Sequence, residues 1–380
     1  MPHIRHPASI GDIAPAAWDA LDTGGQPFLR HAYLKALEDS GSVGPGTGWM
    51  PCPVTVEDDA GELLATVPLY QKHNSNGEFI FDWDWAEAYA ATGRDYYPKW
   101  VAAVPYTPIS GPRLLLAPHA GGKVRETLLD HLYELARERG VSSLHWLFLE
   151  PGELPLLEAR DSLVRTGCHF EWRNPGAARF DEWLATLSSS RRKSIRRERR
   201  RVREAGIRCE WMTGTELDAD TLATVYELYV TNYHVHGMRP YLTPGFFPAL
   251  AATLPEALAV CLARRGGNIV AAAIFLEGGN ALYGRYWGAF EWVDCLHFEV
   301  CYYQGIERAL ARGYNLFHPG VQGEHKLLRG FEPTLHYSAH WLRDDDFRRA
   351  VGHFLTRERS AVDAYADAAE RYLPYRKPGP

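Results

Sequence analysis

Alternating apolar and polar residues recur in two distant stretches of the chain. Each stretch contains three short apolar segments separated by turns rich in Gly, Asn and Asp, which is typical of antiparallel hairpins. In the first half the predicted strands are 53–57, 63–70 and 78–85. In the second half they are 259–263, 269–276 and 281–287. The sequence therefore predicts the same three-stranded meander in both halves.

A helix and a further strand follow each meander. The helices are predicted over 123–139 and 296–312, and the strands over 141–149 and 314–318. Gly140 and Gly313 suit the left-handed backbone that ends many helices. Other helices are predicted over 28–40, 219–232, 244–254 and 346–372. The expected fold class is α/β (α+β), with two domains, each a mostly antiparallel mixed sheet flanked by helices.

The predicted domain boundaries follow from this repeat. The first domain is expected over 1–177 and the second over 178–343, and the C-terminal segment 344–380 is expected to pack on the first. A basic helix over 188–206 opens the second domain.

Positive charge is concentrated in the basic segment 188–206. The segment holds nine Arg or Lys and one acid between Arg191 and Arg203, in a chain of net charge −6. Such a cluster attracts phosphate groups, and arginine suits bidentate phosphate contact. A thin apolar seam is predicted at Leu184, Leu187, Ile195 and Val202. The alternative is a solvated surface helix between the two domains. The predicted phosphate-binding residues are Arg191, Arg192, Lys193, Arg196, Arg197 and Arg200.

Composition narrows the class of protein. The chain has 380 residues, which is enough for two domains, and its 46% hydrophobic content is typical of globular proteins. No apolar run approaches the roughly 20 residues that span a bilayer, and the N-terminus does not resemble a signal peptide. The six cysteines are scattered, which favours reduced thiols in the cytoplasm. The overall acidity argues against a general DNA-binding protein.

Several sequence stretches carry a family resemblance, and the order of helices, strands, helix and strand is similar to a GCN5-related N-acetyltransferase (GNAT) domain in tandem. The stretches are 27–49, 68–89, 191–206, 239–247, 283–290, 296–309 and 320–333. Together they resemble the FemABX aminoacyl-tRNA-dependent transferases. The resemblance is closer to the FemAB-like bacterial proteins grouped as peptidoglycan biosynthesis/recognition proteins.

This resemblance implies a reaction and its partners. The expected function is aminoacyl-tRNA-dependent transfer that forms an amide bond on an amine acceptor, either a cell-wall precursor or a natural-product intermediate. Aminoacyl-tRNA would be a co-substrate, and no bound cofactor is expected. One alternative is an acyl-CoA-dependent N-acyltransferase. The other is a non-catalytic module that binds peptidoglycan precursors or RNA.

The segment 285–290 tests the CoA alternative. A pyrophosphate loop of the form Q/R-x-x-G-x-G/A places backbone N–H groups around the phosphates. Arg285 and Gly288 match it, but Phe290 stands where a small residue is needed. The sequence therefore predicts weak or no CoA binding. Tyr283, Arg285, Tyr286 and Trp287 are predicted to line the substrate cleft.

The catalytic candidates of the second half lie at the start of the predicted helix 296–312 and after the predicted strand 314–318. Amide formation needs a group that takes the proton from the attacking amine, and Glu299 or His297 is predicted for this role. Helix capping by Glu299 and a core position for His297 are the alternative. Lys326 is predicted to stabilise an oxyanion or a phosphate, with His325 beside it as a substrate-binding residue.

Asp82 and Asp84 are the candidates of the first half. On a strand they share one face, where they would bind an amine or act as a base, or pair with Arg94 or Arg113. His234 and His236 lack a third ligand at suitable spacing, so no metal site is expected.

Overall fold

The computed structural model describes residues 2–321 and 323–376. The chain folds as two compact units, the first formed by Met1–Gly167 and Leu335–Asp363, the second by Cys168–Thr334 and Ala364–Pro380. These bounds correct the predicted boundaries. The strands β9 (Leu163–Arg173) and β15 (Glu332–Leu342) and the helix α12 (Asp345–Glu370) each contribute residues to both units. The predicted C-terminal segment is therefore divided, and its residues 377–380 lie outside the described residues.

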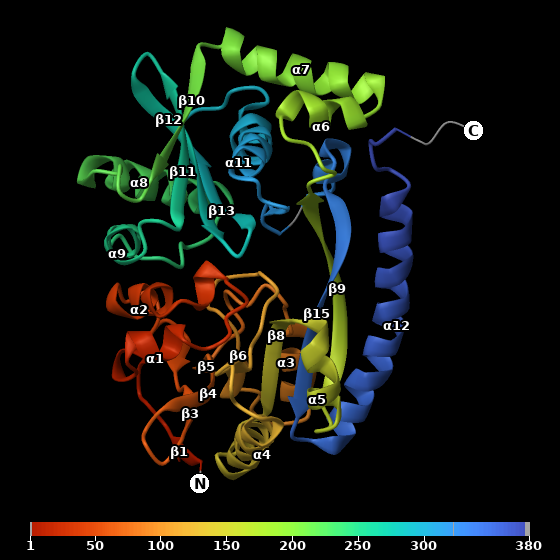
Figure 1. The fold of residues 1–380 in the computed structure, drawn as a ribbon. Coiled ribbons are helices and arrows are strands. Elements are labelled where there is room, and N and C mark those ends of the chain that lie inside the picture. Colours follow the sequence, from red (N-terminus) through yellow and green to blue (C-terminus); the bar gives the residue numbers. More distant parts are fainter. Residues whose placement is uncertain (1, 322, 377–380) are drawn as a thin grey trace. The chain divides into compact units, whose positions relative to one another are not determined.

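Unit 1 contains two runs of paired strands (Figure 1). One run has the order β1-β3-β4-β7 and the other β2-β5-β6-β8-β15. The strands are β1 (His3–Arg5), β2 (Trp49–Pro51), β3 (Val54–Glu57), β4 (Leu63–Val67), β5 (Leu69–Lys72), β6 (Lys99–Ala102), β7 (Leu115–Leu116) and β8 (Ser143–Leu149). The α-helices are α1 (Pro15–Asp19), α2 (His31–Asp39), α3 (Trp83–Ala90), α4 (Gly122–Glu138) and α5 (Leu154–Glu158). Short 3-10 turns cover Ile10–Asp12, Pro27–Leu29 and Pro151–Glu153.

Unit 2 is built on the strand order β10-β11-β12-β13-β14-β9. Its strands are β10 (Ile207–Thr213), β11 (Leu258–Arg265), β12 (Asn268–Gly278), β13 (Ala281–Ala289) and β14 (Leu316–His318). Its α-helices are α6 (Phe180–Thr186), α7 (Ser189–Glu204), α8 (Ala219–Val235), α9 (Phe246–Thr253), α10 (Leu296–Phe298) and α11 (Gln304–Arg312). A π-helical segment η4 (Glu299–Tyr303) joins α10 to α11, and a 3-10 helix η5 (Glu324–Arg329) follows β14.

The two units share one motif. In unit 1, β5 pairs antiparallel with β6, and β6 pairs parallel with β8 after the crossover through α4. In unit 2, β12 pairs antiparallel with β13, and β13 pairs parallel with β14 after the crossover through α11. Gly140 and Gly313 end these helices with φ of 70° and 71°, as predicted. The predicted fold class of tandem GNAT-like units is confirmed.

Both faces of the sheet in unit 2 are covered. Phe275 on one face packs into a core with Ile306 and Leu310 of α11. Ile274 on the opposite face is also fully buried, and α8 packs against β12 and β13. Because these strands are buried between two layers of helices, the side chains that point to either face of the sheet are apolar.

Candidate functional site

The basic helix α7 has a buried face and an exposed face. Ile195 and Val202 are each 1% exposed and, with Leu184 and Leu187, form the predicted apolar seam in the core of unit 2. The exposed or half-exposed face carries the six predicted phosphate-binding residues, Arg191, Arg192, Lys193, Arg196, Arg197 and Arg200. Of these, Arg192 also donates from Nη1 to the Leu187 carbonyl at 2.5 Å, so it supports the end of α6.

Arg199 points inward from α7 and anchors it to the helix that follows β13. Its guanidinium donates to both oxygens of Glu299, at 2.9 to 3.2 Å, and to both oxygens of Glu307, at 2.7 and 2.8 Å. Burial alone would lower the pKa of Arg199, but Glu307 and Glu299 raise it above its usual value. Gln304 also donates to Glu299 at 2.9 Å. The carboxylate oxygens of Glu299 are therefore held by Arg199 and Gln304. This geometry favours a role for Glu299 in positioning the helix over the predicted role as the catalytic base.

A second inward contact joins α7 to η5. Glu198 accepts from Arg329 Nη2 at 2.9 Å and from the Tyr303 hydroxyl. Arg329 also donates from Nε to the Tyr303 hydroxyl and from Nη1 to the His325 carbonyl, each at 2.9 Å. Its guanidinium lies 3.4 Å from the centre of the Phe298 ring. These contacts fix the backbone on which His325 and Lys326 stand.

The helix predicted over 296–312 is interrupted. Cys295 precedes it with a left-handed φ of 66°, and the π-helical segment at Glu299–Tyr303 follows its first turn. Non-glycine residues with positive φ and π-bulges both gather at functional sites because the surrounding structure must hold them. The irregularity places Tyr302 toward His325, and the Tyr302 hydroxyl lies 2.8 Å from His325 Nε2.

His297 lies in an aromatic cluster beside this segment. Its ring centre is 5.1 Å from those of Trp287 and Tyr302, and 5.9 Å from that of His325. Burial, reinforced by the nearby His325 and Lys326, lowers the pKa of His297 to about 4. The imidazole is therefore neutral at pH 7 and keeps a nitrogen lone pair, which a proton acceptor needs.

Lys326 is 1% exposed at the start of η5. Its ammonium donates to the carbonyls of Gly320 at 2.6 Å and Val321 at 3.2 Å. Burial lowers the pKa of Lys326 to about 7. The predicted polar residues His297, His325 and Lys326 thus gather around one part of unit 2, between η4 and the segment after β14.

The predicted cleft residues of β13 do not share one face. Trp287 lies against His297, whereas the Tyr286 ring is 5.0 Å from that of Tyr229 on α8. Tyr283 is buried in the strand, opposite His318 of β14. Arg285 and Gly288 belong to the strand itself, not to a loop between a strand and a helix. The partial match to a pyrophosphate loop therefore lacks the loop geometry that phosphate binding needs.

Gly288 is instead required by packing. A Cβ atom built on it would lie 1.8 Å from the Leu228 carbonyl oxygen of α8. We expect Gly288→Ala to lower the free energy of unfolding by roughly 1–3 kcal/mol, because the helix backbone has to move. Thermal unfolding of the purified protein measures this, with Gly152→Ala, a site with open space around it, as the control. Equal melting temperatures for the two variants would contradict the expectation.

Asp82 and Asp84 are not arranged as predicted. Trp83–Ala90 forms the helix α3, so the strand predicted over 78–85 is wrong, and Asp82 occupies the N-cap position. Asp82 is buried while Asp84 is exposed. The predicted arginine partners are engaged elsewhere: Arg94 pairs with Asp344, and Arg113 donates to backbone carbonyls.

A buried charge cluster surrounds Asp82, and the sequence analysis missed it. Lys99 is fully buried and donates to Asp82 at 2.5 Å and Glu78 at 2.9 Å. Burial tends to raise the pKa of Asp82, but Lys99 and the nearby His145 hold it well below its usual range. Burial raises the pKa of Glu78 to about 7. Burial lowers the pKa of Lys72 to about 7, and its ammonium lies 3.8 Å from the centre of the Trp49 ring.

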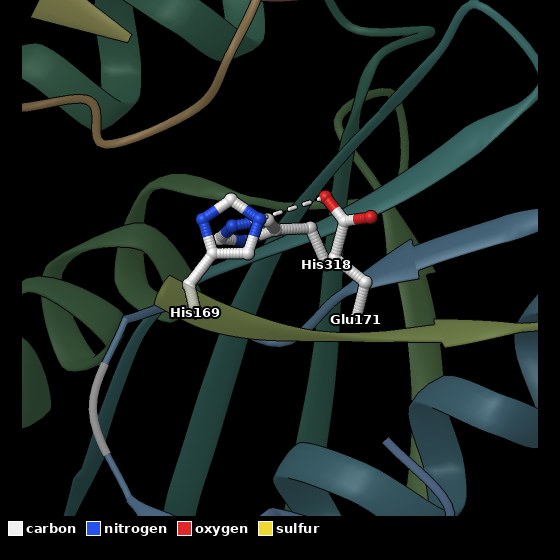
Figure 2. A group of neighbouring side chains, drawn as sticks. All are labelled: His169, Glu171 and His318. Atoms are coloured by element: carbon white, nitrogen blue, oxygen red, sulfur yellow. Dashed lines mark hydrogen bonds and ion pairs between the residues drawn. The ribbon is translucent and has the colours of Figure 1, made fainter. Parts of the chain in front are cut away.

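A third group of polar residues was also missed. His169 and Glu171 on β9 and His318 at the end of β14 point toward one another (Figure 2), and all three are buried. His169 Nε2 lies 3.0 Å from Glu171 Oε1, and the rings of His169 and His318 are centred 4.8 Å apart. The i, i+2 spacing of His169 and Glu171 was readable from the sequence, since such residues share one face of a strand.

The described residues, 2–321 and 323–376, include no helix that is both long and apolar enough to cross a membrane. The chain matches no curated protein. It is similar in fold to the crystal structure of FemX, with 12% identity, a TM-score of 0.53, and coverage of 92% of this chain and 100% of that one. A conserved protein of unknown function from Bacteroides thetaiotaomicron VPI-5482 has 12% identity and a TM-score of 0.50, covering 89% and 99%.

The family assignment rests on the sequence. The family model described as peptidoglycan biosynthesis/recognition, FemAB-like, matches residues 9–377. A match of this extent includes both units and every candidate residue discussed above. The chain therefore belongs to the FemAB-like family of peptidoglycan biosynthesis/recognition proteins.

Proposed function

We propose that this protein is an acyltransferase that moves an aminoacyl group from tRNA to an amine acceptor and forms an amide bond. The family and the GNAT-type fold support a transferase of the acyltransferase class. The observation that supports tRNA as the donor is the exposed basic face of α7. The inner face of the same helix is ion-paired to η4 and η5. A polyanion bound on the exposed face would contact α7. Ion pairs from the inner face of α7 hold η4, which lies next to His297, and η5, which contains Lys326.

The residues of unit 2 fit the chemistry of this step. The amine nitrogen attacks the ester carbonyl, the new C–N bond forms, and the C–O bond to the tRNA ribose breaks. We assign the amine proton to neutral His297, from which it passes to the departing ribose oxygen and forms the free hydroxyl. Lys326 donates to the carbonyl oxygen as negative charge develops there. Glu299 and Arg199 position the helix.

The acceptor class follows from the family description. An amine on a peptidoglycan precursor is the proposed acceptor, and aminoacyl-tRNA is the proposed co-substrate in place of CoA. The in-strand position of Arg285 and Gly288 supports this choice, because the matching residues do not themselves form the loop whose N–H groups hold a pyrophosphate.

The basic face provides the test. We expect the triple variant Lys193→Gln, Arg197→Gln, Arg200→Gln to flatten the slope of log affinity for tRNA against log salt by roughly two to three units, because each lost phosphate contact removes about 0.7–0.9. Filter binding of labelled tRNA across a salt series measures the slope. The matched control removes three exposed cations, two from α12 and one from the turn that follows it: Arg349→Gln, Arg357→Gln, Arg371→Gln.

Product formation separates the alternatives. The native protein, mixed with radiolabelled aminoacyl-tRNA and an amine-bearing peptidoglycan precursor, is expected to transfer label into an alkali-stable amide. tRNA binding without amide product would favour a binding module. An unchanged salt slope in the α7 variant, together with label transfer from acyl-CoA, would overturn the tRNA proposal.

A further inference from the structure

We propose that His169, Glu171 and His318 form a binding site for one divalent transition-metal ion in unit 2, and that zinc is the ion that the site suits best. The inference concerns metal content and does not rest on the transfer reaction.

The fold brings the three side chains together from distant parts of the chain. β14 pairs antiparallel with β9, with Leu316 opposite Arg173 and Phe317 opposite Trp172. Continuing this register by one residue places His318 opposite Glu171. Figure 2 shows His169 and Glu171 rising from one strand toward His318. One donor atom from each side chain lies within 4.8 Å of the others.

The donor set matches zinc chemistry. Two imidazoles and one carboxylate are the protein ligands of many three-ligand zinc sites that keep a fourth position open. Ligand atoms about 2.0–2.2 Å from one zinc ion lie roughly 3–4 Å apart. The 3.0 Å between His169 Nε2 and Glu171 Oε1 already meets this spacing, and small side-chain rotations bring His318 within it. Imidazole ligands disfavour magnesium and calcium, which prefer oxygen.

Burial makes an ion energetically useful. His169, Glu171 and His318 are 4%, 7% and 1% exposed, and three polar groups removed from water need compensating interactions. Part of this compensation comes from the hydrogen bond between His169 and Glu171 and from those that Arg173 and the Gly320 N–H donate to Glu171 and His318. A shared ion would compensate all three at once and would replace the proton between His169 and Glu171.

The surroundings orient the ligands. Arg173 donates to the second oxygen of Glu171 at 2.9 Å, which leaves the first oxygen directed at His169. The Gly320 N–H donates to His318 Nδ1 at 3.2 Å, a long bond whose loss is the cost of ligation through that nitrogen. Such outer contacts fix the orientation of metal ligands and are worth about 10–100-fold in affinity. Arg173 contacts Glu171 and the Lys326 ammonium contacts Gly320, two residues after His318, and these two cations temper the affinity for a dication.

The ion would also act on the segment that follows β14. His318 is two residues from Gly320, whose carbonyl accepts from the Lys326 ammonium. Ligation of His318 would therefore hold the backbone that positions Lys326.

Metal stoichiometry tests the proposal directly. The full chain is purified without chelator, its affinity tag is removed, and elemental analysis is expected to find about one zinc per chain. After chelation and dialysis, calorimetric titration with Zn²⁺ is expected to restore one equivalent, and Co²⁺ is expected to give the visible absorption of a four-coordinate site. Mg²⁺ is expected to give neither signal.

Variants locate the site. His318→Ala is expected to weaken zinc binding by at least about 100-fold, the upper range for outer contacts alone. Glu171→Gln preserves the shape of the side chain and is expected to weaken binding similarly, so it serves if His318→Ala does not fold. The matched control is the double variant His234→Ala, His236→Ala, which removes the exposed His-x-His pair and should leave the stoichiometry at one. A native chain that binds no Zn²⁺ or Co²⁺, or binding that both ligand variants retain, would overturn the proposal.

Discussion

Lys99→Met is expected to lower the local free energy of unfolding of unit 1 by about 3–5 kcal/mol at pH 8, because it leaves buried Glu78 and Asp82 without their shared cation. Burial tends to lower the pKa of Lys99, but the two carboxylates raise it above its usual value, so the native side chain is charged. Methionine fills a similar volume, so the loss measures the unpaired carboxylates more than a cavity.

The same variant has a predictable pH dependence. Without Lys99 the folded-state pKa of Asp82 rises above its unfolded value near 4, and that of Glu78, which burial already raises to about 7, rises further. A carboxyl with a raised folded-state pKa destabilises progressively as pH increases from its unfolded pKa to its folded one. The stability difference between native and variant protein should therefore be smaller at pH 5 than at pH 8.

Hydrogen exchange followed by mass spectrometry measures this effect separately in each unit. Peptides from β5 and β6 are expected to exchange faster in Lys99→Met, while peptides from β11 and β12 provide the internal reference. Lys35→Met is the control, because Lys35 forms an exposed pair with Asp39 and should change stability by less than about 0.5 kcal/mol. Equal protection in Lys99→Met and the native chain at pH 8 would contradict the prediction.

Arg199→Met is expected to destabilise unit 2 by a similar amount, about 3–5 kcal/mol, because buried Glu299 loses its bidentate partner and Glu307 loses the same cation. The neighbouring Arg200 is the matched control: its side chain is 61% exposed, and Arg200→Met should change stability by less than about 0.5 kcal/mol. The two variants remove the same charge from adjacent positions of α7.

Exchange of peptides from α7 and from the segment 296–312 reports the outcome. Faster exchange in both segments for Arg199→Met alone would show that the inward ion pairs hold the two helices. If Arg200→Met has the larger effect, the assignment of the buried and exposed faces of α7 is incorrect.

The elements of unit 2 were largely predictable from local pattern. The three strands of its meander extend a few residues beyond the predicted bounds, to 258–265, 268–278 and 281–289. Gly-rich turns between apolar segments specify hairpins locally, so their positions need no tertiary information. The helix α7 was predictable for the same reason: no Gly or Pro interrupts it, and Ile195 and Val202, about two helical turns apart, mark its inner face.

The first half shows where local pattern misleads. The alternation in Asp82–Trp85 matches a strand, yet Trp85 and Tyr89 pack one helical turn apart on Leu342, Val351 and Leu355. Residues from the far end of the chain decide this choice. The segment predicted as one strand over 63–70 is likewise two strands, β4 and β5, which pair with different neighbours on either side of Pro68.

By itself the sequence determined the family, the order of elements in unit 2 and the concentration of positive charge on one helix, because each depends on residues close together in the chain. Only the tertiary structure decided which charges face inward. Arg199 and Glu299 are 100 residues apart, and His169 and His318 meet only because β9 pairs with β14. Contacts between distant residues leave no periodic signal in the sequence, so the burial of Lys99, the engagement of Glu299 and the His169–Glu171–His318 group became visible only in the fold.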